Sequence, residues 1–109
     1  MSNYLLNFQS DIKYLFNKNK IYGFFTRIGG NSSGNYKSLN GSYNNNDKKK
    51  NVDSNRLMIA RKFKVKKKNF CFLNQTHSSK VIEISKNNKN KKISADGMIT
   101  KTKGILLGI

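Results

Sequence analysis

The chain of 109 residues has no proline, no tryptophan and a single cysteine. One cysteine cannot form a disulfide within the chain, and this fits a reducing compartment. Acidic side chains are also scarce: five stand against 22 lysines and arginines, which gives a formal net charge of +17. The hydrophobic fraction of 36% is below the usual share and predicts a thin core. The length suits one small domain or part of a larger one.

Long apolar runs are absent as well. No stretch approaches the roughly 20 residues that a membrane helix needs. The first residues, MSNYLLNFQSDIKYLF, lack a basic start followed by an apolar block, so we expect no signal peptide. Together these absences predict a cytoplasmic protein.

The positive charge raises nucleic acid as a possible partner. However, the basic residues are nearly all lysines spread among many asparagines, a composition that an A- and T-rich genome produces through its codons. The basic segments DKKK, KVKKK and KNNKNKK fall in different predicted loops and lack interleaved aromatic residues for base stacking. We interpret them as solvated segments that bind polyanions weakly and salt-sensitively, and we expect no specific nucleic-acid partner.

Several strand patterns and one helical pattern follow one another along the chain. Residues 21–27 are β-branched and aromatic and predict a buried strand that ends in a glycine-rich loop. Residues 69–74 are apolar on both faces and predict a strand covered on both sides. Further short elements are predicted at residues 4–6, 12–16, 81–84, 98–100 and 105–109.

One amphipathic helix is predicted to end at about residue 63. Asp47 or Asn51 is its expected N-cap, because short polar side chains accept the free amides of a first turn. Its apolar face holds Val52, Ile59, Ala60 and Phe63, with Met58 beside them.

Five residues could carry chemistry or shape a site. Arg27 precedes a glycine pair, where its guanidinium could bind phosphate through two parallel hydrogen bonds, or it is an ordinary surface arginine before a turn. His77, the only histidine, could be a metal ligand or general base, or a loop residue without chemistry. Asn40 could bind a ligand or make a turn. We interpret Cys71 as a buried core residue and Asp96 as shaping the turn before the next strand.

Four short motifs follow one another in a particular order: GFFTRIGGNSSGNYKSLN, DKKKNVDSNRLMIA, LNQTHSSKV and ADGMITKTKGILLGI. In this order and at this spacing they resemble the YfiH family, also called the polyphenol oxidase, laccase-domain or peptidoglycan editing factor family. The resemblance runs from about residue 22 to residue 109.

The resemblance implies a mixed-sheet α/β sandwich flanked by helices. It also implies a zinc-dependent purine nucleoside enzyme, which cleaves adenosine, inosine, guanosine and methylthioadenosine with phosphate and deaminates adenosine. Carried over by motif, His77 of QxH is the first of three metal ligands, Arg27 of TRxGG is a candidate for holding phosphate, and Asn40 of SLN lies near the active site. Other descriptions of the family are a copper-type phenol oxidase and a hydrolase that edits a cell-wall precursor.

The chain departs from the family pattern at its end. The family's ADC cysteine and a later histidine should follow GILLGI, and Cys71 cannot replace that cysteine because it lies upstream of QxH. Ser78 also stands where a glycine is usual. We therefore expect residues 1–109 to be the N-terminal part of a single YfiH-like domain, incomplete at its C-terminus and inactive alone. A basic nucleic-acid-binding module and a decayed remnant are the alternatives outside enzymes.

Overall fold

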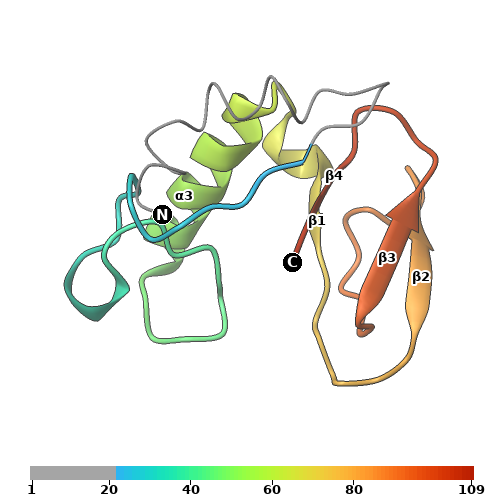
Figure 1. Cartoon of the computed structure of the whole chain (residues 1–109), viewed down its shortest axis with the longest axis horizontal. Coiled ribbons are helices and arrows are strands. Elements are labelled where there is room, and N and C mark those ends of the chain that lie inside the picture. The colour runs from blue at the N-terminus through green and yellow to red at the C-terminus, as the bar shows by residue number, and fades with distance from the viewer. Residues whose placement is uncertain (1–21) are drawn as a thin grey trace. The chain divides into compact units, whose positions relative to one another are not determined.

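The computed structural model of the chain describes residues 22–109, so the elements predicted at residues 4–6 and 12–16 lie outside the described residues. Along the described part of the chain the elements are η1 (Gly34–Tyr36), α3 (Lys49–Lys62), η2 (Lys67–Asn69), β1 (Phe70–Phe72), β2 (Val81–Ile84), β3 (Gly97–Thr100) and β4 (Leu106–Gly108) (Figure 1). Two compact units meet within α3: one ends at Asn55 and the other comprises Arg56–Ile109. Among the described helices none has the length and apolar character needed to span a membrane.

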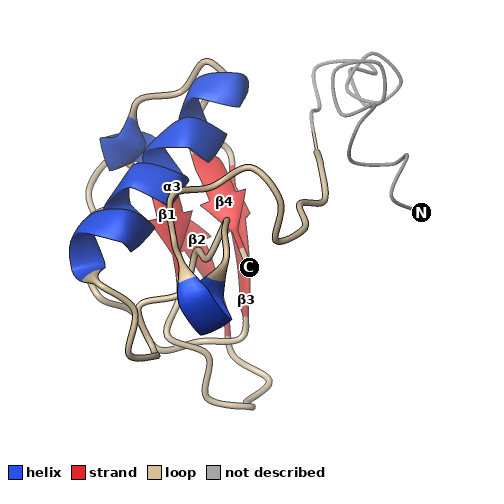
Figure 2. Cartoon of the chain, turned by 90° about the vertical axis from the view of Figure 1, so that its left-hand side faces the viewer, coloured by secondary structure: helices blue, strands red, loops and turns tan. Residues whose placement is uncertain are grey.

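In the first unit, the described residues before α3 form loops and turns around η1 (Figure 2, tan). The buried strand predicted at residues 21–27 is wrong for residues 22–27, which have no regular secondary structure. Tyr22 and Phe24 are 59% and 78% exposed. A β-rich sequence becomes a strand only when another strand accepts its backbone hydrogen bonds, and among the described residues no strand pairs with this segment.

Helix α3 confirms the predicted amphipathic pattern. Its apolar face is buried over Val52, Ile59 and Ala60, and Phe63 is buried just after the helix ends. Both predicted N-caps, Asp47 and Asn51, are wrong, because Lys48 directly precedes the helix and its carbonyl accepts the amides of residues 51 and 52. Asn51 lies inside the first turn. Asp47 instead accepts the amide of Lys48 at 2.8 Å.

In the second unit, β1 and β4 pair in parallel, which confirms the strand predicted near the end of the chain. The strand predicted at residues 69–74 is shorter than expected, and only Cys71 in it is buried. The rings of Phe70 and Phe72 lie on the other face, 4.5 Å apart between centroids. The Arg56 guanidinium carbon stands 3.6 Å from the Phe72 ring centroid, so a cation covers this face in place of apolar packing.

Strands β2 and β3 also pair in parallel (Figure 1). Their register runs from Val81 opposite Gly97 to Ile84 opposite Thr100. Both were predicted from their β-branched sequences, and both are confirmed. The Thr100 hydroxyl donates to the Ile84 carbonyl at 2.8 Å, which ties the carboxyl ends of the two strands together. Since the strands are parallel, the segments that follow them leave the sheet at the same end, beyond the carboxyl ends of both strands.

The alternation along β2 predicts very different costs for two truncations in one strand. Ile84 is 2% exposed, so Ile84→Ala should lower the free energy of unfolding by about 2–5 kcal/mol. Val81 is 62% exposed, so the control Val81→Ala should change it by less than about 0.5 kcal/mol. Urea denaturation of both variants checks this, and equal losses would contradict the burial pattern.

Candidate functional site

The TRxGG loop is closed by Ser38 of the SLN segment. The amides of Gly29 and Gly30 both donate to the Ser38 hydroxyl oxygen at 3.0 Å, and this hydroxyl donates to the Arg27 carbonyl at 2.8 Å. The same carbonyl accepts the amides of Ser38 and Leu39 at 2.7 and 2.8 Å. Two motifs that are separate in the sequence therefore form one hydrogen-bonded loop.

Both glycines of this loop have a structural reason. Gly29 has a φ of 100°, a conformation that side chains with a Cβ rarely adopt. A Cβ on Gly30 would lie 2.1 Å from the Ser38 carbonyl oxygen and 2.4 Å from the Leu39 Cα. The backbone of the SLN segment occupies this space, so the loop closes only around a glycine.

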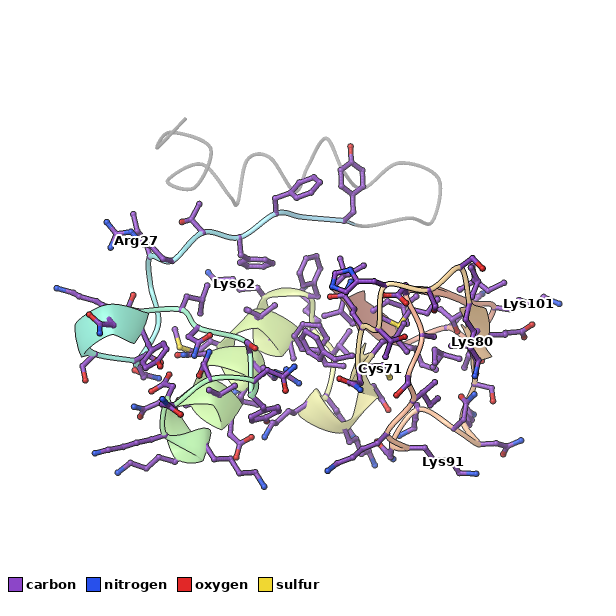
Figure 3. All side chains as sticks on the ribbon, turned by 90° about the horizontal axis from the view of Figure 1, so that it is seen from below. Arg27, Lys62, Cys71, Lys80, Lys91 and Lys101 are labelled. Atoms are coloured by element: carbon purple, nitrogen blue, oxygen red, sulfur yellow. The ribbon has the colours of Figure 1, made fainter. Side chains whose placement is uncertain are left out.

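The guanidinium of Arg27 is the charged group that this loop presents. Its side chain is exposed and extends away from the ribbon (Figure 3). The amides of Gly29 and Gly30 already donate to Ser38, so they are not free to bind an anion at the turn. An anion at this loop would therefore depend on the Arg27 side chain.

A buried amide connects the same loop to helix α3. Asn55 is 0% exposed, and its side-chain carbonyl accepts the amide of Asn31 at 2.6 Å. Its side-chain nitrogen donates to the Ser32 hydroxyl and to the Asn40 carbonyl, both at 2.9 Å. Every polar atom of this buried side chain has a partner, so it holds three loop positions at once.

The side chain of Asn40 is engaged within its own loop. Its nitrogen donates to a carboxylate oxygen of Asp47 at 3.1 Å and to the Asn45 side-chain oxygen at 3.2 Å, and its oxygen accepts the amide of Ser42 at 3.1 Å. The Ser32 hydroxyl also donates to Asp47, and these bonds lower the pKa of that carboxyl, Ser32 most strongly. The side chain of Asn40 thus shapes the loop of residues 40–47, which follows the SLN segment.

His77 lies in a second loop, in the unit from Arg56 to Ile109, and is organised by Asp96. The carboxylate of Asp96 accepts the amides of Thr76, His77 and Ser78 at 3.0, 2.9 and 2.5 Å, and also the hydroxyls of Thr76 and Ser78. These bonds, led by those from Ser78, hold the pKa of the Asp96 carboxyl far below its usual range. Asp96 was predicted to shape the turn before β3; its side chain instead reaches back to the QxH loop.

These hydrogen bonds to Asp96 hold His77 in an unusual backbone conformation. Its φ is 58°, in the left-handed region that residues other than glycine seldom occupy. Three successive amides directed at one carboxylate stabilise such a turn. The imidazole is exposed, so the loop holds the histidine outward rather than packing it into the core.

Cys71 is buried, as predicted, and is 3% exposed. Burial raises the pKa of its thiol, with a smaller opposing effect from Lys89. A thiol that keeps its proton at neutral pH is a poor nucleophile.

Among the described residues, no three histidine, cysteine, aspartate or glutamate side chains gather where they could hold a metal ion. The described residues supply one candidate donor, His77, and do not by themselves fit a complete zinc or copper site.

The sequence did not predict the structural roles of three residues, Ser38, Asn55 and Asp96. Asn55 left a signal, because it is a polar residue on the apolar helical face of Val52 and Ile59. Ser38 and Asp96 stand in the SLN and ADG motifs, but serine and aspartate are common in loops for local reasons, so the motifs did not reveal their distant partners.

The sequence profile of a family described as multi-copper polyphenol oxidoreductase laccase matches residues 21–109. The chain is 31% identical over 101 residues to purine nucleoside phosphorylase YlmD of Bacillus subtilis. This match covers 85% of the chain and 36% of the relative, so the chain spans about a third of that relative's length.

Solved structures agree with the sequence matches. YfiH of Bacillus licheniformis superposes with a TM-score of 0.74 at 26% identity, over 78% of this chain and 35% of that chain. YlmD of Geobacillus stearothermophilus gives the same TM-score at 24% identity, over 80% and 35% of the two chains, and shows the likeness of fold alone. The predicted YfiH-like α/β class is confirmed.

The closed TRxGG loop predicts that Gly30 tolerates no side chain. Gly30→Ala should destabilise the protein by about 1–3 kcal/mol, because the new Cβ meets backbone atoms that cannot rotate away. Gly41→Ala is the matched control, since nothing lies within 4 Å of its added Cβ. Urea denaturation measures both, and a Gly30 variant as stable as the control would show that the loop is not closed in this way.

The role of Asp96 predicts a local effect in the QxH loop. One carboxylate oxygen of Asp96 accepts the His77 amide and the other accepts the Ser78 amide. In Asp96→Asn, if the remaining oxygen still accepts the His77 amide, a nitrogen that donates stands opposite the Ser78 amide. Hydrogen exchange at the Ser78 amide should quicken by about tenfold or more. The control Glu83→Gln, at an exposed position of β2, should leave this amide unchanged. Unchanged exchange in Asp96→Asn would remove the carboxylate as the organiser of the loop.

Proposed function

The chain belongs to the family of multi-copper polyphenol oxidoreductase laccases, the YfiH family, and from this membership we propose that it is the N-terminal part of a purine nucleoside phosphorylase. The proposed substrates are inorganic phosphate and a purine nucleoside: adenosine, inosine, guanosine or methylthioadenosine. Deamination of adenosine is proposed as an additional reaction of the complete protein. The name of the Bacillus subtilis relative supports the reaction class.

The observation that carries the proposal is the exposed guanidinium of Arg27 on a loop that hydrogen bonds hold closed. In phosphorolysis, a phosphate oxygen bonds to the anomeric carbon of the sugar while the bond from this carbon to the base breaks. The electron pair leaves with the base, and the other product is a sugar 1-phosphate. Phosphate must therefore be held and aimed, and a planar guanidinium does this through two hydrogen bonds.

Ser38 and Asn40 have supporting roles in this proposal. Ser38 fixes the Arg27 backbone through its hydroxyl, and Asn40 fixes the neighbouring segment through Asp47. A rigid backbone reduces the freedom that the arginine loses when it binds phosphate. We thus assign Arg27 to phosphate binding, and Asn40 to positioning near the substrate.

His77 is proposed as one ligand of a zinc ion in the complete protein, with copper as the alternative. A bound zinc ion would supply a water molecule that ionises near neutral pH, as deamination requires. The contribution of the described residues is a histidine held outward by the bonds from its loop to Asp96. The remaining ligands would come from chain outside the described residues.

Phenol oxidation is the second candidate, because the family description names a polyphenol oxidoreductase. Substrate profiling of the complete protein separates the two. Phosphate-dependent release of a purine base supports the first function. Oxidation of phenols, without such release from any nucleoside, supports the second.

The proposal predicts a selective defect when Arg27 is changed. In the complete protein, Arg27→Gln should raise the KM for phosphate by about tenfold or more and leave the KM for the nucleoside nearly unchanged, because a charge-assisted bond to one substrate is lost. Arg27→Lys should recover only part of this loss, since lysine lacks the fork geometry.

Arg61→Gln provides the control, as it removes an equal charge from the exposed last turn of α3. The assay follows base release over a range of phosphate concentrations. An unchanged KM for phosphate in Arg27→Gln, or an equal rise in Arg61→Gln, would exclude Arg27 as the phosphate ligand.

A further inference from the structure

A hollow of about 490 Å³ in the unit Arg56–Ile109 gathers lysines from three separate segments of the chain. The lysines that line it are Lys64, Lys66, Lys68, Lys86, Lys89 and Lys103. Five of these lysines belong to KVKKK and KNNKNKK, which are predicted from the sequence to be separate solvated loops, and Lys103 belongs to KTKG. The structure places all six around one hollow, and we call the surface they form the lysine hollow.

The parallel pairing of β2 and β3 explains how two of these segments meet. Lys86 follows the carboxyl end of β2, and Lys103 follows the carboxyl end of β3. These ends lie side by side in the sheet, joined by the bond from Thr100 to Ile84. In α/β sheets, ligands bind preferentially beyond the carboxyl ends of parallel strands.

The third segment precedes β1 and is tied to the others by a hydrogen bond. The ammonium nitrogen of Lys89 donates to the backbone carbonyl of Lys68 at 3.3 Å. A neighbouring hollow shares Lys64 and Lys66 and adds Arg61 and residue 67 to its lining, so the basic surface continues past one edge. The two hollows together are lined by basic residues from Arg61 to Lys103.

Negative charge is lacking around the lysine hollow. Between residues 56 and 109 the sequence has two carboxylate side chains, Glu83 and Asp96, and neither lines it. Asp96 is committed to the QxH loop by the bonds described above. The ammonium groups are therefore left uncompensated by carboxylates of the lining, and their fields add over the hollow.

We infer that the lysine hollow binds the sugar-phosphate backbone of a nucleic acid without reading its sequence. A row of phosphates supplies the several linked charges that six ammonium groups require, whereas one phosphate ion does not. No aromatic residue lines the hollow, so base stacking cannot give sequence preference there. Lysine is depleted at protein–protein interfaces, which disfavours an acidic protein as the partner.

The test compares two triple variants of the complete protein that lose the same charge. The first, Lys66→Gln, Lys86→Gln and Lys103→Gln, takes one exposed lysine from each segment of the hollow. The control, Lys48→Gln, Lys49→Gln and Lys50→Gln, changes three exposed lysines at the start of α3. Fluorescence anisotropy with a labelled 20-nucleotide single-stranded RNA, and with DNA of the same length, measures affinity as salt is raised.

We expect the hollow variant to weaken binding at least tenfold more than the control, with either probe. The slope of log affinity against log salt should also fall by about two, the value for three lost phosphate contacts on a single strand. Equal losses in the two variants would overturn the inference, because net charge alone would then explain the binding. Equal displacement of the RNA by polyglutamate at the same charge concentration would also overturn it, in favour of an acidic protein.

Thermal unfolding of both variants shows whether either has lost its fold. If the hollow variant is unfolded, the single substitutions Lys66→Gln, Lys86→Gln and Lys103→Gln are compared with single substitutions in the control set. Each hollow substitution must then weaken nucleic-acid binding more than its control, and equal affinities would overturn the inference.

Discussion

The buried amide of Asn55 is the contact on which the first unit depends. The described residues before helix α3 contain no strand and no buried hydrophobic side chain, so their positions must come largely from hydrogen bonds. Asn55 provides these from a fixed point on the helix, through bonds to Asn31, Ser32 and Asn40. A buried polar group is stable only when all its bonds are made, so the amide specifies one arrangement of the loop.

Scarce carboxylates play a similar part in both units. Asp47 accepts hydrogen bonds from Ser32 and Asn40, and Asp96 accepts the amides of the QxH loop. In a chain with five acidic side chains and 22 basic ones, these two accept hydrogen bonds from backbone amides and uncharged side chains. Hydrogen bonds to the ionised form lower the pKa of both carboxyls, so both loops keep their anionic anchors at neutral pH.

Neither of these two carboxylates lines the lysine hollow or bonds the Arg27 guanidinium in the bonds described above. The exposed guanidinium of Arg27 suits one small anion, while the lysine hollow suits a chain of linked phosphates. The difference follows from geometry, since a planar fork fits a single phosphate, and several flexible ammonium groups fit a row of them. Phosphate chemistry thus links the two proposals, although they rest on different residues and different loops.

The sequence by itself determined the family, the helix with its buried face, and most of the strands. These follow from the order of short motifs and from local periodicity, both of which are present in the residues of each segment. Local pattern failed at residues 22–27, because a β-rich segment without a pairing strand stays irregular. It also could not assign Asp96 to a loop about 20 residues upstream.

Only the tertiary structure decided which polar groups meet. Asn55 and Asn31, which bond to each other, are 24 residues apart in the sequence, and Ser38 and Gly29 are nine apart. The lysine hollow joins segments from residue 64 to residue 103. Such contacts depend on how elements pack and on which strands run parallel. A serine, an asparagine or a lysine suits many positions in a loop equally well, so its identity does not reveal the one partner that folding provides.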